Sequence, residues 1–449
     1  MDDRTQQLEN GRIGPLLLTF ALPAIIATAA TSCYNIIDRM FIGNGVGTNA
    51  LAGLGITLPV MNLSTALGTL VGAGAAALVS LRIGERRREE ATRILCNALL
   101  LNIIISIAFT VLMLAFLDPI LLLFGADRDT LPYAREFLRI ILIGNVVTHI
   151  FFGLNSVMRA SGYPIKAMIS VLITVFCNLI LAPLFIFAFH WGIRGAALAT
   201  VLSQLVGACW VIAHFCRKRS YIHFEKQEMR LHLRLAGEMF AIGLAPFFIH
   251  VCASVVTILM NWQLKTHGGT PAIASYGIVA AINSLVISMI LGLTHGMQPI
   301  VGFNYGAGHR DRALQTYRLT VLCATILCAL CFAAVELAPT SIASAFTDDP
   351  VLTAGTTVAL RLCCAMMLTL GFQVVTSNFF QSIGKARIAI FLSLSRQIIF
   401  LLPFLWLLPP AFGVMGAWYA TPAADLCACA VTAVILFVFM RKRYWKTVN

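Results

Sequence analysis

Long apolar runs constrain this chain more than any other feature of its sequence. A run of about 20 apolar residues is long enough to cross a bilayer as a helix. Backbone groups in lipid must satisfy their own hydrogen bonds, and runs of this length can do so only as α-helices. The windows predicted to span a membrane are 13–37, 50–80, 92–117, 132–157, 166–188, 194–216, 235–262, 272–303, 313–337, 353–380, 387–409 and 413–440.

The composition supports a membrane protein rather than a soluble one. Only 11% of the 449 residues are charged and 59% are hydrophobic, whereas soluble domains carry about 25% charged residues. We therefore predict an all-α polytopic membrane protein with about 12 transmembrane helices, whose main partner is the lipid bilayer. The net charge of +13 belongs in loops on one side of the membrane. No basic stretch has interleaved aromatic residues, so no nucleic-acid partner is expected.

The positive charges mark the sides of the membrane. Lys and Arg follow the even-numbered spans, whereas the odd-numbered connections carry Asp118, Asp127 and Asp129 with few basic residues. Basic residues are retained in cytoplasmic loops. Both termini and the basic segment 217–234 are therefore predicted to be cytoplasmic.

The two halves of the chain repeat each other. Equivalent residues recur 221 to 223 positions apart, as in Pro23 and Pro246, Asp38 and Asn261, Gly74 and Gly296, Gly162 and Gly384, and Gly195 and Gly416. Such internal symmetry is typical of transporters. Six spans per half predict parallel repeats, with an N-terminal six-helix lobe (1–216), a cytoplasmic linker (217–234) and a C-terminal six-helix lobe (235–449).

Several segments together resemble the multidrug and toxic compound extrusion (MATE) transporters of bacteria. They are Asn-Ile-Ile-Asp-Arg-Met-Phe-Ile-Gly (35–43), Ala-Leu-Ala-Gly-Leu-Gly (50–55), Met-Arg-Ala-Ser-Gly (158–162), the glycine-rich 296–308 and Gln-Ser-Ile-Gly-Lys (381–385). The resemblance implies a V-shaped pair of six-helix bundles, monomeric, in the cytoplasmic (inner) membrane. It also implies export of small organic cations in exchange for H⁺ or Na⁺.

The resemblance assigns ion coupling to the first lobe. Family members that couple there use an acid at the position of Asp38, with Asn178 and Thr200 as its partners. That pattern has a second Asp before the proline of the fifth span, where this chain has Ala182 before Pro183. A Na⁺ site rich in hard oxygens is then incomplete, and H⁺ is the favoured ion. The alternative is that Asp38 only caps its helix or pairs with Arg39.

Two further charges lie deep in apolar spans. Arg396 and Asp425 are expected within salt-bridge reach, because an unpaired charge in hydrocarbon is costly. The pair either supports the fold or contacts substrate. His250 and His295 are either proton relays or hydrogen-bonded helix contacts. The predicted cavity or polar network also includes Tyr34, Asn35 and Gln298.

These features predict a secondary antiporter that exports amphiphilic, often cationic, compounds. One alternative is a flippase for lipid-linked sugars, although a pyrophosphate cavity would need several deep basic residues and only Arg396 is deep. Another is a membrane-embedded enzyme, which would need clustered His and acidic residues at catalytic spacing. We expect no catalytic residues, no metal site and no cofactor beyond the coupling ion.

Overall fold

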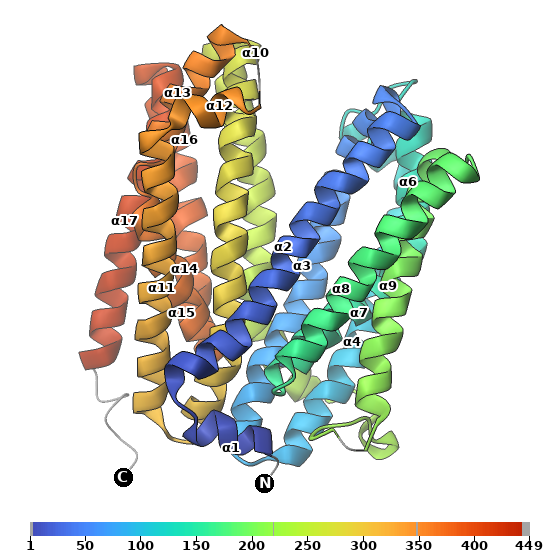
Figure 1. The fold of residues 1–449 in the computed structure, drawn as a ribbon, viewed down its shortest axis with the longest axis vertical. Helices are drawn as coiled ribbons and strands as arrows, with labels where there is room; N and C mark the ends of the chain where they lie inside the picture. Colours follow the sequence, from blue (N-terminus) through green and yellow to red (C-terminus); the bar gives the residue numbers. More distant parts are fainter. Residues whose placement is uncertain (1–2, 219, 347–348, 442–449) are drawn as a thin grey trace.

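The chain folds into two helical bundles that together form a V (Figure 1). The structure, a computed structural model, describes residues 3–218, 220–346 and 349–441. Every regular element within those ranges is a helix, which confirms the predicted all-α fold. The bundles meet at the end that carries the short helix α1 (Asp3–Asn10) and diverge toward the other end.

The N-terminal bundle contains the first six predicted spans. A short helix, α5 (Leu117–Leu123), follows the third of them. The spans are α2 (Ile13–Gly45), α3 (Thr48–Gly84), α4 (Arg88–Ala115), α6 (Leu131–Ile143) with α7 (Asn145–Ala160), α8 (Pro164–Pro183) with the π-helix η1 (Leu184–Ala188), and α9 (Gly192–Cys216).

The C-terminal bundle follows a connection that contains only the 3-10 turn η2 (Lys226–Glu228); residue 219 of the predicted linker lies outside the described residues. The bundle also contains the short helix α12 (Pro339–Ser344). Its spans are α10 (Leu233–Gly306), α11 (Arg310–Leu337), α13 (Pro350–Cys364) with α14 (Met367–Ser382), α15 (Ala386–Leu394) with the π-helix η3 (Ser395–Leu401) and α16 (Leu402–Phe412), and α17 (Val414–Arg441).

Three of these helical segments are interrupted, one at the junction between two predicted spans and two within spans that the sequence alone predicts as straight. The helix α10 contains two spans that meet at Gly269, whose φ of 66° lies in the left-handed region that favours glycine. The fourth and tenth spans are bent pairs, α6 with α7 at 54° and α13 with α14 at 47°. Counting each bent pair as one span gives twelve in the described chain, as predicted.

Glycines allow the two lobes to approach closely at the narrow end of the V. A Cβ added at Gly74 of α3 would lie 2.0 Å from the carbonyl oxygen of Met239 in α10. A Cβ added at Gly296 of α10 would lie 2.4 Å from the Cα of Ala21 in α2. Gly74 and Gly296 are equivalent in the repeat, so each lobe contributes the same contact to the interface. Small residues at such crossings are typical of membrane helix packing.

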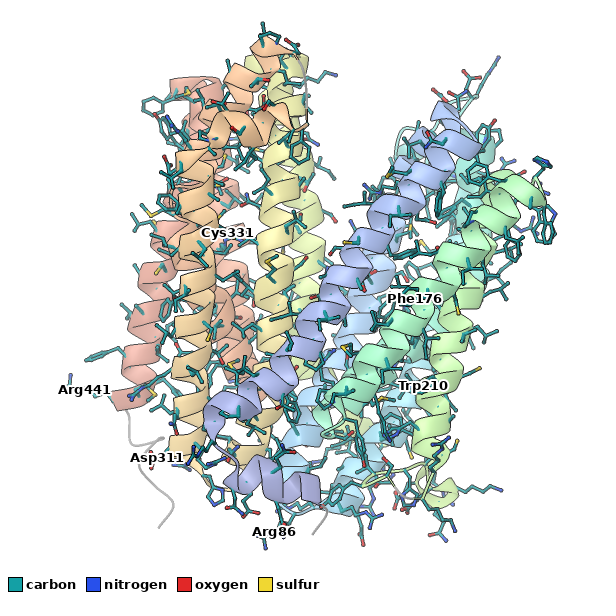
Figure 2. All side chains as sticks on the ribbon, in the orientation of Figure 1. Arg86, Phe176, Trp210, Asp311, Cys331 and Arg441 are labelled. Carbon is teal, nitrogen blue, oxygen red and sulfur yellow. The ribbon has the colours of Figure 1, made fainter. Side chains whose placement is uncertain are left out.

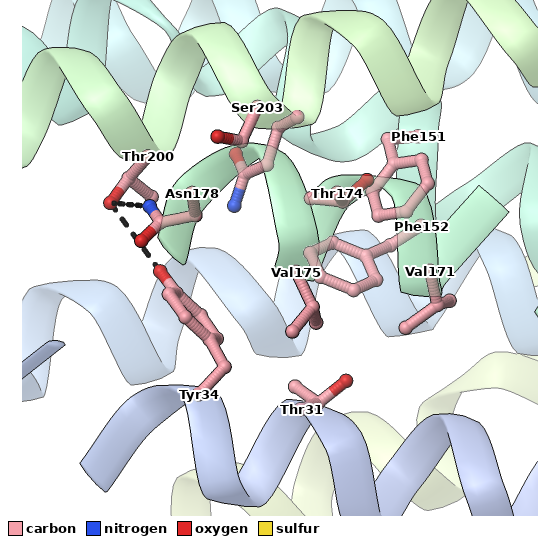
Figure 3. A pocket seen from close by; sticks show the side chains of 11 residues that line it. Thr31, Tyr34, Phe151, Phe152, Val171, Thr174, Val175, Asn178, Thr200 and Ser203 are labelled. Carbon is pink, nitrogen blue, oxygen red and sulfur yellow. Dashed lines mark hydrogen bonds between the residues drawn. The ribbon is translucent and has the colours of Figure 1, made fainter. Parts of the chain in front are cut away.

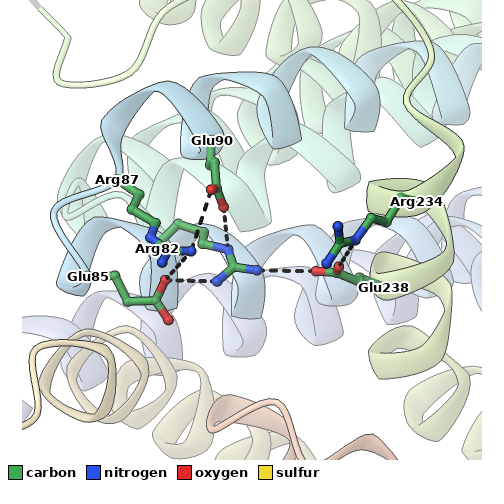
Figure 4. A network of polar contacts seen from close by, with 6 residues as sticks. All are labelled: Arg82, Glu85, Arg87, Glu90, Arg234 and Glu238. Atoms are coloured by element: carbon green, nitrogen blue, oxygen red, sulfur yellow. Dashed lines mark hydrogen bonds and ion pairs between the residues drawn. The ribbon is translucent and has the colours of Figure 1, made fainter.

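Polar contacts also join the lobes at this end. Arg82 of α3 lies 2.8 Å from Glu85, 3.0 Å from Glu90 and, across the interface, 3.3 Å from Glu238 of α10 (Figure 4). The equivalent residue of the other lobe, Asn304, donates a hydrogen bond of 3.2 Å to the carbonyl of Leu8 in α1. Both contacts therefore reach from one lobe to the first helical segment of the other.

The outer surface is apolar and the narrow end is charged. Phe176 and Trp210 are 60% and 40% exposed on the outside of the N-terminal bundle, as expected of side chains that face lipid (Figure 2). Exposed Arg86, Asp311 and Arg441 lie at the end where the lobes meet. This distribution matches a protein that spans a membrane along the long axis of the V.

Candidate functional site

Three helices of the N-terminal lobe bring a chain of polar side chains together. Thr200 of α9 receives a hydrogen bond of 3.3 Å from the Asn178 Nδ2 of α8. The Tyr34 hydroxyl of α2 lies 3.4 Å from the same Thr200 oxygen, and Thr200 in turn donates to the carbonyl of Ala196 at 3.1 Å (Figure 3). Asn178 and Thr200, separated by 22 residues, therefore contact each other directly, whereas no hydrogen bond joins either of them to Asp38, the partner that the resemblance implied, among the described residues.

Asp38 lies one helical turn beyond Tyr34, on the same side of α2. Its side chain is buried, and its Oδ1 has no hydrogen-bond partner within the described part of the chain. The Oδ1 of Asn178 is unpartnered in the same sense. Arg39, the neighbouring cation, is exposed. The site thus combines one buried carboxyl with a second free acceptor, and Ala182, fully buried, supplies no second acid.

The position of Asp38 within its helix corrects the sequence analysis. The apolar run ends near Ile37, which placed Asp38 at or just inside the end of the span, whereas α2 continues to Gly45. A carboxyl seven residues inside a helix cannot cap either terminus, since capping involves only the flanking residues. The alternative of Asp38 as a helix cap is therefore wrong, because the helix extends through the polar segment that follows the apolar run.

A small cavity lies beside the Tyr34–Thr200–Asn178 chain (Figure 3). Its volume is about 30 Å³, which is enough to hold a water molecule. Most of its wall is apolar and comes from Phe151, Phe152, Val171 and Val175. The remaining lining residues are Thr31, Tyr34, Thr174, Asn178, Thr200, Ser203 and Gln204. Asp38 is not among them, so the carboxyl adjoins the cavity through Tyr34.

Two polar contacts in this lobe have no counterpart in the sequence analysis. Gln204 of α9 accepts a hydrogen bond from Thr148 of α7. His149, also on α7, lies 3.1 Å from the Ser64 hydroxyl of α3, which donates to Asn145 at 2.6 Å. The sequence signal for both is a polar residue inside an apolar span. Without the helix rotations, that signal cannot show which polar residues face one another.

The C-terminal lobe contains the second buried polar centre. The Arg396 Nε lies 2.6 Å from the Asp425 Oδ1. This distance matches the pairing predicted from the two charges. Arg396 lies on the π-helix η3 and Asp425 in the middle of α17. The pair is separate from Asp38, because the two centres lie in different lobes.

In the ranges that the structure describes, no hydrogen bond joins the other predicted residues to either centre. Asn35 is exposed, although Tyr34 beside it is half-buried. Gln298 is buried in α10 and His250 is half-buried in the same helix. His295 interacts electrostatically with Arg159 of α7, so it lies between the lobes. The structure therefore brings together two groups of the predicted residues and leaves these four apart.

The repeat also appears in the match of this chain to a known family. The MatE family profile matches residues 23–184 and again residues 246–407, which covers more than half of the chain. The chain belongs to the MatE family. Its two matches begin at Pro23 and Pro246, the same pair of prolines that marks the repeat in the sequence.

Curated relatives align with nearly the whole chain. The multidrug export protein MepA of Staphylococcus haemolyticus (strain JCSC1435) is 27% identical over 442 residues, which are 98% of this chain and 97% of that protein. The structure resembles a crystal structure of a MATE protein in complex with MaL6, with a TM-score of 0.92, 24% identity and complete coverage of both chains.

A second solved structure has the same fold. It is the outward-facing conformation of a multidrug resistance MATE family transporter of the MOP superfamily, with a TM-score of 0.91, 24% identity and 98% coverage of both chains. At this identity the likeness establishes the fold. The protein is thus a multi-pass membrane protein of a transporter family rather than of an enzyme family.

Proposed function

We propose that this protein is a secondary antiporter that exports amphiphilic, cationic organic compounds, and that Asp38 carries the coupling proton. The observation that carries the proposal is the buried, unpartnered Oδ1 of Asp38 beside the Tyr34–Thr200–Asn178 chain. Burial disfavours the charged form of a carboxyl, so protonation and deprotonation of Asp38 change the local energy substantially. The multidrug export proteins that the chain resembles support the class of substrate.

Asp38 belongs to the helix that also contacts the other lobe. Asp38 and Tyr34 lie on α2, and the same helix packs against Gly296 of α10 through Ala21. A proton on Asp38 allows it to donate a hydrogen bond, whereas the carboxylate can only accept one. The two states therefore favour different positions of α2 against α8 and α9. A change in that position shifts the balance between conformations of the lobes.

A proton is the better coupling ion for this site. A Na⁺ ion needs several hard oxygen ligands, and the site offers one carboxyl, the Asn178 carbonyl and two hydroxyls. Ala182, at the position of the family's second acid, cannot supply the missing charge. Exchange of one carboxyl proton requires no such ligand set.

The proposed orientation places both termini in the cytoplasm of a bacterial cell, in the cytoplasmic membrane. Support comes from the basic residues at the narrow end of the V, which cytoplasmic loops retain. The open end of the V then faces outward. A green fluorescent protein fused after residue 449 should fluoresce, and an alkaline phosphatase fused at the same place should be inactive. The opposite pattern would reverse the orientation.

The test of coupling uses proteoliposomes loaded with a fluorescent organic cation. An imposed H⁺ gradient should drive export by the wild type more strongly than an imposed Na⁺ gradient. Asp38→Asn keeps the shape of the side chain but cannot exchange a proton. We expect it to reduce gradient-driven export more than tenfold, since coupling requires a titrating group, while it still binds the dye.

Asp118→Asn provides the matched control. Asp118 is an exposed carboxylate that accepts two bonds of 2.7 Å from Arg135 outside the apolar spans. The same acid-to-amide change should leave H⁺-driven export within twofold of the wild type, because exposed ion pairs contribute about 1 kcal/mol or less. Export by Asp38→Asn at the wild-type rate would show that coupling occurs elsewhere.

A further inference from the structure

The repeat relates the cavity of the N-terminal lobe to a buried centre in the C-terminal lobe. Gly162 and Gly384, just before the fifth and eleventh spans, are 222 residues apart. The same offset relates Thr174 of the cavity to Arg396. Gly195 and Gly416, at the start of the sixth and twelfth spans, are 221 residues apart, which relates Gln204 of the cavity to Asp425. The ion pair therefore occupies the position of two cavity-lining residues.

The equivalence extends to the apolar wall of the cavity. Phe151 lies in the fourth span, which the repeat relates to the tenth, and the offset of 222 residues pairs it with Gln373 of α14. The same offset pairs Val175 with Gln397 of η3. Two apolar residues of the wall in one lobe thus correspond to amides in the other. Both amide oxygens, Gln373 Oε1 and Gln397 Oε1, are buried without a hydrogen-bond partner in the described ranges. Gln373 as a whole is only 3% exposed.

The ion pair leaves much of its hydrogen-bonding capacity unused. Arg396 binds Asp425 through Nε, and neither Nη atom has an acceptor among the residues that the structure describes. Its side chain is 22% accessible, whereas that of Asp425 is 6% accessible. Tyr276 lies near enough to Arg396 to interact with it electrostatically. The guanidinium is therefore anchored at one edge and open at the other.

The local backbone also differs from that of the other lobe. Arg396 and Gln397 lie on the π-helix η3, whereas Thr174 and Val175 lie in the regular helix α8. A π-helical turn is rare and is frequently found at functional sites. Two orphaned buried acceptors are unfavourable unless a ligand supplies donors to them. The free edge of a guanidinium matches a carboxylate, which it binds through two parallel N–H bonds.

We propose that Arg396, Gln373 and Gln397 form a subsite in the C-terminal lobe that takes the carboxylate end of a zwitterionic organic substrate. Asp425 acts as a positioning residue, because it holds the Nε edge of Arg396 and leaves the Nη atoms free. The amides of Gln373 and Gln397 accept from donors of the same ligand. This assignment rests on the proposed export of organic compounds and adds a substrate class to it.

The test compares two dyes that share one chromophore. Rhodamine 110 has a free carboxyl group, and rhodamine 123 is its methyl ester, which lacks the negative charge. Binding to the purified protein is measured by fluorescence anisotropy, and export is measured in proteoliposomes. The main variant is Arg396→Gln with Asp425→Asn, because replacing both charged groups with neutral amides leaves no unpaired buried charge.

The expected result is selective for the carboxylate. The double variant should bind rhodamine 110 about tenfold more weakly than the wild type, the size expected for loss of a charge-assisted bidentate contact. Its affinity for rhodamine 123 should stay within twofold. Arg396→Lys keeps the positive charge but loses the two parallel N–H groups of the guanidinium. It should therefore weaken rhodamine 110 binding by a smaller factor than the double variant does. Gln373→Leu should weaken binding of rhodamine 110 without changing the thermal unfolding midpoint by more than a few degrees.

A second ion pair of the same lobe provides the control. Arg361 and Glu336 lie 3.6 Å apart with side chains that are 54% and 38% exposed. The variant Arg361→Gln with Glu336→Gln removes the same two charges from the lobe and should bind both dyes as the wild type does. An equal effect of the control on rhodamine 110 would show a long-range charge effect and overturn the subsite.

Several outcomes contradict the inference directly. Parallel loss of both dyes in the Arg396 and Asp425 variant would assign the pair to folding. Unchanged binding of both dyes would show that only water occupies the free donors and acceptors. Failure of the wild type to bind rhodamine 110 would also overturn the subsite. Binding of both dyes without export of either would instead contradict the proposed export function, while the affinity ratio would still decide the subsite.

Discussion

The two lobes of this protein share a backbone plan and differ in the chemistry of their centres. In the N-terminal lobe, Thr174 and Gln204 line a small cavity with a largely apolar wall. At the equivalent positions of the C-terminal lobe, Arg396 and Asp425 form an ion pair of 2.6 Å. The positions survived the duplication, whereas the side chains at them diverged. A repeat therefore predicts where a site lies but not what it binds.

The interface between the lobes shows the opposite behaviour. Gly74 and Gly296 occupy equivalent positions, and each meets the backbone of the first span of the other lobe. No side chain other than hydrogen fits where a Cβ would lie 2.0 or 2.4 Å from a backbone atom. Close backbone packing preserves residue identity across the repeat, because any larger residue would separate the helices. The centres carry no such steric constraint.

The largest loss of stability should come from removing one charge of the Arg396–Asp425 pair, the feature that distinguishes the two centres. Arg396→Gln alone, or Asp425→Asn alone, leaves one buried charge without its partner and should lower the free energy of unfolding by about 3–5 kcal/mol. The double variant should recover most of that loss. Thermal and denaturant unfolding of the purified protein measures the coupling.

The equivalent pair of the N-terminal lobe is the control for this cycle. Thr174→Val and Gln204→Leu remove uncharged groups, so each should cost about 1 kcal/mol with little coupling between them. Thr174 gives the clearest test, because within the described part of the chain its hydroxyl donates only to the nearby carbonyl of Ser170. Additive losses in both lobes would show that the ion pair contributes no more than the neutral residues.

An intermediate effect should come from the glycine contacts that both lobes contribute to their interface. Gly74→Ala and Gly296→Ala each force a methyl group against backbone, and overpacking of this kind costs about 1–3 kcal/mol. Both variants should open the narrow end of the V, which spin labels on the two lobes would report as longer distances. Export should fall by a similar factor in each, because the two contacts are equivalent.

Gly237→Ala is the matched control on the same helix as Gly296. A Cβ at Gly237 meets no atom within 4 Å, so this variant should keep the wild-type distances and export. Unequal effects of Gly74→Ala and Gly296→Ala would break the equivalence. In that case one of the two contacts, rather than the pair, would hold the lobes together.

The sequence predicted the parts of this structure that depend on periodicity and length. The apolar windows located twelve spans, and the glycine and proline offsets located the repeat. The pairing of Arg396 with Asp425 followed from the cost of isolated charge in lipid. The bends inside the fourth and tenth spans were not predictable, because they depend on how each helix packs on its neighbours.

The sites were harder to predict than the spans. The resemblance gave Asn178 and Thr200 as partners of Asp38 but not their contact with each other, which spacing could not show because 22 residues and a helix break separate them. Gln204 and Gln373 gave no signal beyond their polarity in apolar runs. Their importance depends on which face of the helix they occupy and on unpartnered atoms, which only coordinates reveal.

The smallest effect should come from the polar contacts at the narrow end. Arg82 and Asn304 are equivalent, yet Arg82 forms an ion pair of 3.3 Å with Glu238 and Asn304 a neutral bond to the Leu8 carbonyl. Glu238→Gln removes the charge from the first contact and should shift the balance between closed and open states by at most about 1 kcal/mol, because partly exposed ion pairs are weak. Spin-label distances between the lobes should register that shift as a change of up to fivefold in the population ratio.

Salt separates the ionic contact from the neutral one. Screening weakens exposed ion pairs as the ionic strength rises, so 1 M salt should move the wild type toward the distances of Glu238→Gln and leave that variant nearly unchanged. Glu136→Gln is the control, because Glu136 pairs with Arg194 at 2.5 Å within the N-terminal lobe alone. Asn304→Ala should shift the distances without any dependence on salt. Two results would contradict this difference between the Arg82 and Asn304 contacts. One is a salt-dependent shift in Asn304→Ala, and the other is a shift of the lobes in Glu136→Gln as large as that in Glu238→Gln.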